Sequence, residues 1–167
     1  MFPSALVATS ASLLERLRGA NLKLATAESC TGGLVAGVLT EIAGSSDVVD
    51  RGFVTYSNAA KMELLGVPEA MLAEHGAVSE PVARAMAQGA LANSQADIAV
   101  SITGVAGPGG GSAAKPVGLV HIAAARRGGG VLHQECRFGD IGRSPIRLAS
   151  VEVALQLVAR AAFGTAP

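Results

Sequence analysis

The chain has 167 residues, and its 13 lysines and arginines are balanced by 13 aspartates and glutamates. The lack of a basic excess argues against a nucleic-acid partner and against an anionic membrane surface, and no apolar run is long enough to span a bilayer. The length predicts a single domain over 1–167, and half of the residues are hydrophobic, which is enough for a sizeable core. Two distant cysteines, Cys30 and Cys136, match no zinc or disulfide framework, so a reducing, cytoplasmic setting is expected.

Hydrophobic spacing predicts that helices and strands alternate along the first 103 residues. Leucines recur on one face of 4–18, and Gly19 is a typical residue to end that helix. Asn58 is expected to cap one later helix, and Ser79 another. The expected elements are helix 4–18, strand 22–26, helix 31–43, strand 48–57, helix 58–65, helical turns 69–74, a helix starting at 79, and strand 96–103.

The last third of the chain has a different pattern. Residues 104–115 form a glycine-rich loop, and two strands at 117–125 and 131–138 flank a loose glycine turn, which predicts a hairpin. A final helix is expected over 144–163. The alternating part of the chain predicts a parallel sheet with helices on both faces, to which the hairpin adds a reversed strand.

A tight turn is expected where the first strand meets the next helix. Ser29, Cys30 and Thr31 precede Gly32 there, and the free N–H groups of the helix start could face a ligand or serve as oxyanion donors beside a nucleophile. Two simpler roles remain open. Ser29 or Thr31 could only cap the helix, and Cys30 could be a buried, inert side chain.

A second glycine-rich turn, residues 104–111, follows the third parallel strand. Both turns are expected at the carboxyl edge of the sheet, where open α/β sheets bind ligands, and backbone N–H groups in such loops cradle phosphate. A flexible connection is the alternative. Lys61 follows the second strand near the same edge, where burial would lower its pKa and make it a general base; a solvated surface lysine is the alternative. The three histidines are scattered and predict no metal site.

Four motifs then stand in a consistent order. They are Thr26–Gly33, Val54–Asn58 with Lys61, His75–Ser79, and Thr103–Gly110 with Lys115–Gly118. Together they resemble the CinA C-terminal domain family, in its stand-alone PncC form. The resemblance implies a three-layer α/β/α sandwich with a mixed, mostly parallel five-stranded sheet. It also implies a homodimeric amidohydrolase without metal or cofactor, which converts nicotinamide mononucleotide to nicotinate mononucleotide and ammonia.

The resemblance also implies roles for particular residues. Ser29 corresponds to the nucleophile and Lys61 to its base, with Tyr56 beside them, while main-chain N–H groups around Cys30, Thr31 and Gly32 would stabilise the oxyanion. The residues expected to bind substrate are Asn58, Thr103, Gly104, Gly107, Gly109, Gly110, Arg143 and Arg147.

Two departures from the family pattern affect these assignments. Ala59 stands where many members have Glu, so no acid is expected there. The segment 139–147 looks longer than usual, which leaves Arg143 and Arg147 competing for one role.

Two other functions remain open from the sequence. A non-catalytic nucleotide-binding module would keep both glycine-rich loops but would need neither Ser29 nor Lys61. A cysteine amidase would use Cys30, for which the sequence places no histidine nearby. Glu28 is not expected to act as the base for Ser29, because neighbouring side chains on a strand point to opposite faces.

Overall fold

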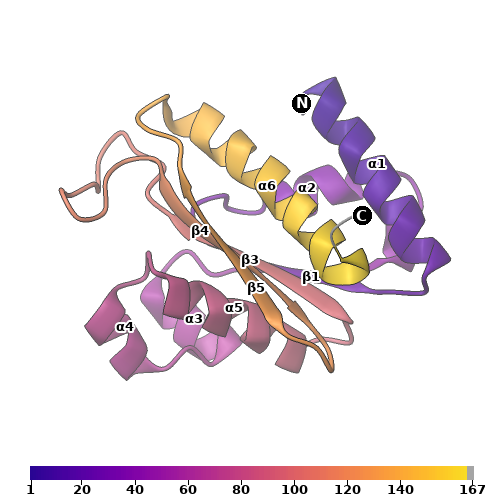
Figure 1. Cartoon of the computed structure of the whole chain (residues 1–167), viewed down its shortest axis with the longest axis horizontal. Helices are drawn as coiled ribbons and strands as arrows, with labels where there is room; N and C mark the ends of the chain where they lie inside the picture. The colour runs from indigo at the N-terminus through magenta and orange to yellow at the C-terminus, as the bar shows by residue number, and fades with distance from the viewer. Residues whose placement is uncertain (165–167) are drawn as a thin grey trace.

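A computed structural model describes residues 1–164 and contains one five-stranded sheet between two layers of helices (Figure 1). Residues 165–167 of the expected domain lie outside the described residues. The elements are α1 Ser4–Gly19, β1 Leu24–Glu28, α2 Leu34–Thr40, a 3-10 turn Ser45–Asp47, β2 Val49–Val54, α3 Asn58–Leu65, α4 Glu69–His75, α5 Glu80–Ala92, β3 Ile98–Gly104, β4 Leu119–Arg126, β5 Val131–Arg137 and α6 Arg143–Phe163. No helix of the described residues is both long and apolar enough to cross a membrane.

The strand order is β2-β1-β3-β4-β5. β1 pairs in parallel with both β2 and β3, whereas β4 runs antiparallel to β3 and to β5. Helices α1, α2 and α6 cover one face, and α3, α4 and α5 cover the other (Figure 1). The expected three-layer sandwich and its mixed sheet are therefore confirmed.

The two faces of the sheet have different side chains because the strands alternate. Large residues such as Leu24, Ile98 and Ile102 face α1, α2 and α6. The opposite face carries alanines from three strands, among them Ala25 and Ala99, which pack against α5. Small side chains let the helices of this layer approach the sheet and one another closely.

One glycine on α5 marks a close approach of two helices. A Cβ placed on Gly89 would lie only 1.9 Å from the carbonyl oxygen of Leu65, the last residue of α3. The sequence alone gave no sign of this contact, because a lone glycine in a helical pattern is read as a weak point. The contact fixes α3 against α5, and α3 carries Lys61.

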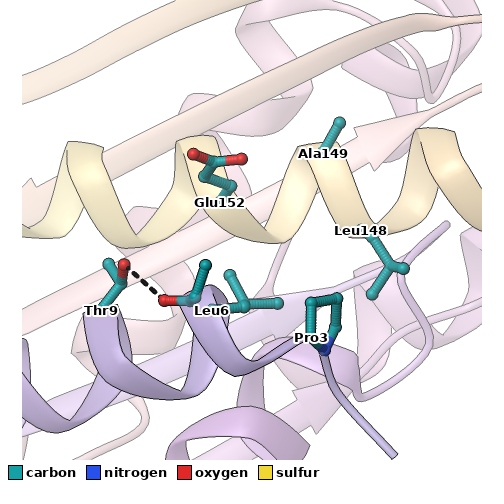
Figure 2. A pocket seen from close by; sticks show the side chains of 7 residues that line it. Pro3, Leu6, Thr9, Leu148, Ala149 and Glu152 are labelled. Atoms are coloured by element: carbon teal, nitrogen blue, oxygen red, sulfur yellow. Dashed lines mark hydrogen bonds between the residues drawn. The ribbon is translucent and has the colours of Figure 1, made fainter.

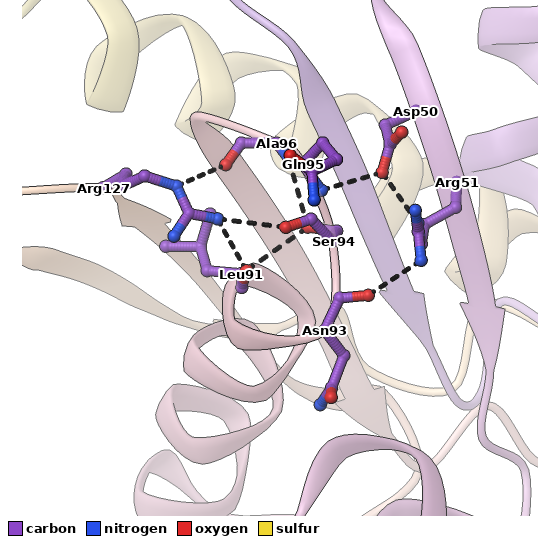
Figure 3. Close-up of polar contacts among 8 residues, drawn as sticks. All are labelled: Asp50, Arg51, Leu91, Asn93, Ser94, Gln95, Ala96 and Arg127. Atoms are coloured by element: carbon purple, nitrogen blue, oxygen red, sulfur yellow. Dashed lines mark hydrogen bonds and ion pairs between the residues drawn. The ribbon is translucent and has the colours of Figure 1, made fainter.

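Polar contacts hold together the edge of the sheet where the parallel strands begin (Figure 3). Arg127 donates hydrogen bonds to the carbonyls of Ala96, Leu91 and Ser94, and thereby closes the end of α5. The carboxylate of Asp50 accepts from the Gln95 N–H. Charged hydrogen bonds of this kind stabilise more than neutral ones, so these contacts stabilise this edge of the sheet.

Several expected boundaries and caps are wrong. The helix expected over 31–43 is shorter, because residues 29–33 form the turn itself and α2 spans only Leu34–Thr40. Ser57, not Asn58, caps α3 by accepting the Ala60 N–H at 3.1 Å. The hydroxyl of Ser79 does not cap α5; it donates to the Gly76 carbonyl.

We predict that Gly89→Ala destabilises the protein by about 3 kcal/mol, because overpacking a filled contact costs about that much. Gly19→Ala is the matched control, since Gly19 also lies in a helix but has no atom near its Cβ position. Chemical denaturation measures both variants. Equal stabilities for the two variants would contradict the close approach of α3 and α5.

Candidate active site

The carboxyl ends of β1, β2 and β3 meet at one edge of the sheet and form an open cavity of about 290 Å³. Ser29 directly follows β1, Tyr56 follows β2, and the glycine-rich loop follows β3. The lining residues are Ser29, Cys30, Tyr56, Val78, Gly104, Val105, Ala106, Gly107, Gly109, Gly110 and Arg143. The structure thus brings together the two glycine-rich turns that the sequence places at this edge.

A buried lysine contacts the hydroxyl of Ser29 beneath this cavity. The Lys61 Nζ lies 3.0 Å from the Ser29 Oγ and 2.9 Å from the Thr55 carbonyl oxygen. Lys61 is 1% exposed and Ser29 is 9% exposed. Burial lowers the pKa of Lys61, although the neighbouring Cys30 acts in the opposite direction. A lysine in this environment is closer to the neutral form that accepts a proton.

The path of the chain explains why Lys61 is buried. The Thr55 N–H donates to the Glu28 carbonyl, which ties the end of β2 to the end of β1. Ser57 then starts α3, and Lys61 and Leu65 lie one helical turn apart on its buried face. The Lys61 side chain is therefore buried, and its Nζ contacts the Ser29 Oγ and the Thr55 carbonyl oxygen at the end of the sheet.

Glu28 and Ser29 serve opposite faces of the sheet, as the alternation of the strand predicts. The Glu28 carboxylate accepts the N–H groups of Gly33, Val35 and Ala36 at 3.0, 3.1 and 2.9 Å. It therefore caps α2, and the expectation that Ser29 or Thr31 caps this helix is wrong. These three N–H groups are already bonded, so they are not free to face a ligand.

The N–H groups expected to stabilise an oxyanion are not equivalent. The Gly32 N–H donates to the Ser29 carbonyl at 3.0 Å, inside the turn. Within the described part of the chain, the N–H groups of Cys30 and Thr31 make no hydrogen bond to another residue. The expected set of three donors is thereby reduced to Cys30 and Thr31.

Arg143 and Arg147 have separate positions and do not compete for one. Arg143 lines the cavity and donates to the Gly107 carbonyl at 2.7 Å and to the Tyr56 hydroxyl at 3.0 Å. Arg147 instead donates to the carbonyls of Cys30 and Thr31 at 3.0 and 2.8 Å. Tyr56 is 61% exposed, so it lies at the rim beside Arg143.

Two expected substrate contacts are not among the residues that line the cavity. Asn58 is exposed in the first turn of α3. Thr103 is buried, and its hydroxyl donates to the Ala77 carbonyl at 2.8 Å. Conversely, Val78 lines the cavity although no role was predicted for it, because an apolar side chain in a loop carries no chemical signal.

Another hollow lies outside this site. A hollow of about 230 Å³ between α1 and α6 is lined mostly by apolar side chains (Figure 2). Its single carboxylate, on Glu152, shares the hollow with one hydroxyl, that of Thr9, which donates to the Ala5 carbonyl at 3.0 Å. Residues 1–164 contain no group of three or more His, Cys, Asp or Glu side chains placed to hold a metal ion.

Cys30 is buried and unpaired beside Ser29. Burial raises the pKa of its thiol to about 12, so almost none of it is thiolate near neutral pH, and the thiolate is the reactive form.

We predict that iodoacetamide at about pH 8 alkylates Cys30 in the folded protein far more slowly than in denaturant. Peptide mass spectrometry measures both rates. Fast labelling of Cys30 in the folded protein would contradict this account.

Comparison with known proteins places the chain in a family. Residues 7–162 match the family model of the CinA C-terminal domain. The chain is 52% identical to the nicotinamide-nucleotide amidohydrolase PncC of Escherichia coli over 93% of its own length and 94% of that protein. It is 55% identical to a CinA-like protein of Mycobacterium sp. over 83% of its length, but covers only 32% of that longer protein.

A solved structure agrees with the assignment. The competence/damage inducible protein CihA of Agrobacterium tumefaciens superposes with a TM-score of 0.95 at 55% identity, over 97% of this chain and 98% of that one. The chain therefore belongs to the CinA C-terminal domain family.

Proposed function

We propose that this protein hydrolyses the carboxamide of nicotinamide mononucleotide, giving nicotinate mononucleotide and ammonia through a Ser-Lys acyl-enzyme mechanism. The observation that carries the proposal is the 3.0 Å contact between the Lys61 Nζ and the Ser29 Oγ. A relative that is 52% identical over nearly the whole chain bears the name of a nicotinamide-nucleotide amidohydrolase, which supports the substrate.

The reaction follows from the positions of the two side chains. Neutral Lys61 takes the hydroxyl proton of Ser29, whose Oγ attacks the carboxamide carbon and gives a tetrahedral oxyanion. The N–H groups of Cys30 and Thr31 stabilise that oxyanion. Lys61 then gives its proton to the departing nitrogen, so that ammonia leaves and an ester to Ser29 remains. A water molecule, deprotonated by Lys61, then attacks the ester carbon. The bond to the Ser29 Oγ breaks, Lys61 returns its proton to that oxygen, and the product leaves as the carboxylate.

Two other functions fit the site less well. A non-catalytic nucleotide-binding module has no need for an amine at 1% exposure against a serine hydroxyl, since burying an amine is costly. A cysteine amidase would need a thiolate at Cys30, but the pKa of that thiol is about 12. The burial of the Lys61 amine and the high pKa of the Cys30 thiol therefore both favour Ser29 as the nucleophile.

We propose that the substrate phosphate binds between the 104–111 loop and Arg143. The loop lines the cavity with several glycines whose backbone a ligand can approach. The Arg143 guanidinium reaches over the same cavity from the start of α6 and binds the Gly107 carbonyl. An arginine beside glycine N–H groups is a typical phosphate site. Asn58 and Thr103 are not part of this proposal, because neither lines the cavity.

We also propose a cytoplasmic homodimer. Both cysteines are free thiols, which fits a reducing compartment. β2 is an edge strand of the sheet, and Val54 at its end is 50% exposed. An unpaired strand edge is a surface of the kind that pairs with a second chain. Light scattering is expected to give twice the mass of the chain, and a strictly monomeric mass at micromolar concentration would refute the dimer.

We predict that Ser29→Ala lowers ammonia release from nicotinamide mononucleotide by at least about 1,000-fold while the fold survives, because only a hydroxyl is lost. Cys30→Ala is the matched control at the next position and should keep most of the activity, since its N–H remains. A coupled ammonia assay measures the rates, and circular dichroism checks the fold. An inactive Cys30→Ala with an active Ser29→Ala would assign the nucleophile to the thiol.

We predict that nicotinamide riboside, which lacks the phosphate, binds roughly 30-fold more weakly than the mononucleotide. Gly109→Val should raise KM for the mononucleotide, because the valine side chain would crowd the cavity that Gly109 lines. A Cβ at this position has no close neighbour in the protein, so no clash with the fold is expected. Gly107 is unsuitable for this test, since its φ is +74° and a Cβ there would lie 2.7 Å from Val117.

The matched control is Gly130→Val, in the distant hairpin turn and also without close neighbours. Steady-state kinetics measure each variant. Equal KM values for the riboside and the mononucleotide would remove the phosphate from the account.

A further inference from the structure

We infer that Arg147 is a positioning residue that orients the oxyanion donors, and that it does not bind substrate. This inference rests on the proposed amidase reaction. It departs from the expectation that Arg143 and Arg147 are alternatives for one substrate contact.

Arg147 reaches from α6 across to the turn after β1. Its Nε donates to the Cys30 carbonyl at 3.0 Å, and its Nη2 donates to the Thr31 carbonyl at 2.8 Å. A Cβ on Gly32 would lie 3.3 Å from the same Nη2, so the guanidinium lies directly against this glycine. The planar fork of arginine matches two neighbouring acceptors in a way that a lysine ammonium does not.

The contacts to carbonyl oxygens determine where the N–H groups point. A trans peptide is planar, and its N–H and C=O point in opposite directions. Fixing the Cys30 carbonyl therefore fixes the Thr31 N–H, because both belong to one peptide unit. The Ser29 carbonyl, which accepts the Gly32 N–H at 3.0 Å, fixes the Cys30 N–H in the same way.

The Thr31 carbonyl completes the arrangement. Its bond to Arg147 fixes the Gly32 N–H, the donor that holds the Ser29 carbonyl. All three peptide units from Ser29 to Gly32 are thus held through their carbonyls, either directly by Arg147 or through this internal bond. The two N–H groups that remain without another residue as acceptor are those of Cys30 and Thr31, beside the nucleophile.

The rest of the turn is fixed independently. Glu28 holds the N–H groups of Gly33, Val35 and Ala36, and the Ser29 N–H donates to the Ile102 carbonyl at 2.9 Å. Removal of Arg147 should therefore loosen the peptides between residues 29 and 32 without releasing the strand or the helix. Donors that must reorganise during the reaction stabilise the oxyanion less than fixed ones.

The test compares Arg147→Ala with Arg143→Ala, which lies one helical turn earlier on α6. In the active enzyme, Arg147→Ala should lower kcat by about 100-fold, the typical effect of losing one oxyanion donor. In a Ser29→Ala background, calorimetry with nicotinamide mononucleotide should give an unchanged Kd for Arg147→Ala and a weaker Kd for Arg143→Ala. Arg147→Lys, which keeps the charge but not the fork, should lose nearly as much kcat as Arg147→Ala.

Hydrogen exchange supplies a readout that needs no substrate. The Gly32 amide, which is bonded to the Ser29 carbonyl, should exchange faster in Arg147→Ala and at the wild-type rate in Arg143→Ala. If Arg147→Ala weakens substrate binding as strongly as Arg143→Ala, or leaves both kcat and Gly32 exchange unchanged, the inference is wrong. An inactive wild type would reject the proposed function, and the exchange data would still decide whether Arg147 fixes the turn.

Discussion

The burial of the Lys61 amine against the Ser29 hydroxyl is the constraint on which the rest of the site depends. A lysine at 1% exposure loses most of its hydration, and two oxygen atoms, Ser29 Oγ and the Thr55 carbonyl, replace part of it. No carboxylate forms an ion pair with it in the described residues. Burial lowers the pKa of Lys61 and shifts the balance toward the neutral amine relative to a solvated lysine, and the neutral amine is the form that a base requires.

The sheet places the other parts of the site with little freedom. Alternation along β1 sends Glu28 to the face covered by α2 and Ser29 to the face covered by α3. The acid caps a helix, and the serine meets the lysine. Because β1, β2 and β3 are parallel neighbours, their carboxyl ends deliver the turn, the lysine helix and the glycine loop to one edge. The charged contacts of Arg127 lie at the opposite edge, away from the cavity.

Much of this arrangement could be predicted from the sequence, since it follows from local patterns. Apolar runs placed the strands, glycine-rich turns marked the functional edge, and motif order indicated the family. The sequence could not show what depends on long-range contacts. Nothing local indicates that Glu28 caps α2, or that Arg147 binds the carbonyl of Cys30, which lies 117 residues earlier in the chain. Nor does local sequence indicate that Thr103 is bonded to Ala77 instead of facing the cavity. Such partners are set by the packing of distant segments, and sequence spacing does not encode them.

The central claim is that Lys61 is a neutral base, and nuclear magnetic resonance titration of its 15N-labelled side-chain nitrogen tests this most directly. The Lys61→Arg variant, which cannot deprotonate near neutral pH, assigns the signal by its absence. Because burial penalises the charged form, the account predicts an apparent pKa below the ordinary lysine value of 10.5, with the rate of the wild type rising with pH through the same value. Ammonia release should be lost in Lys61→Arg. A Lys61 pKa at or above 10.5, together with near-normal turnover in Lys61→Arg, would contradict the account and leave position 61 with a charge-only role.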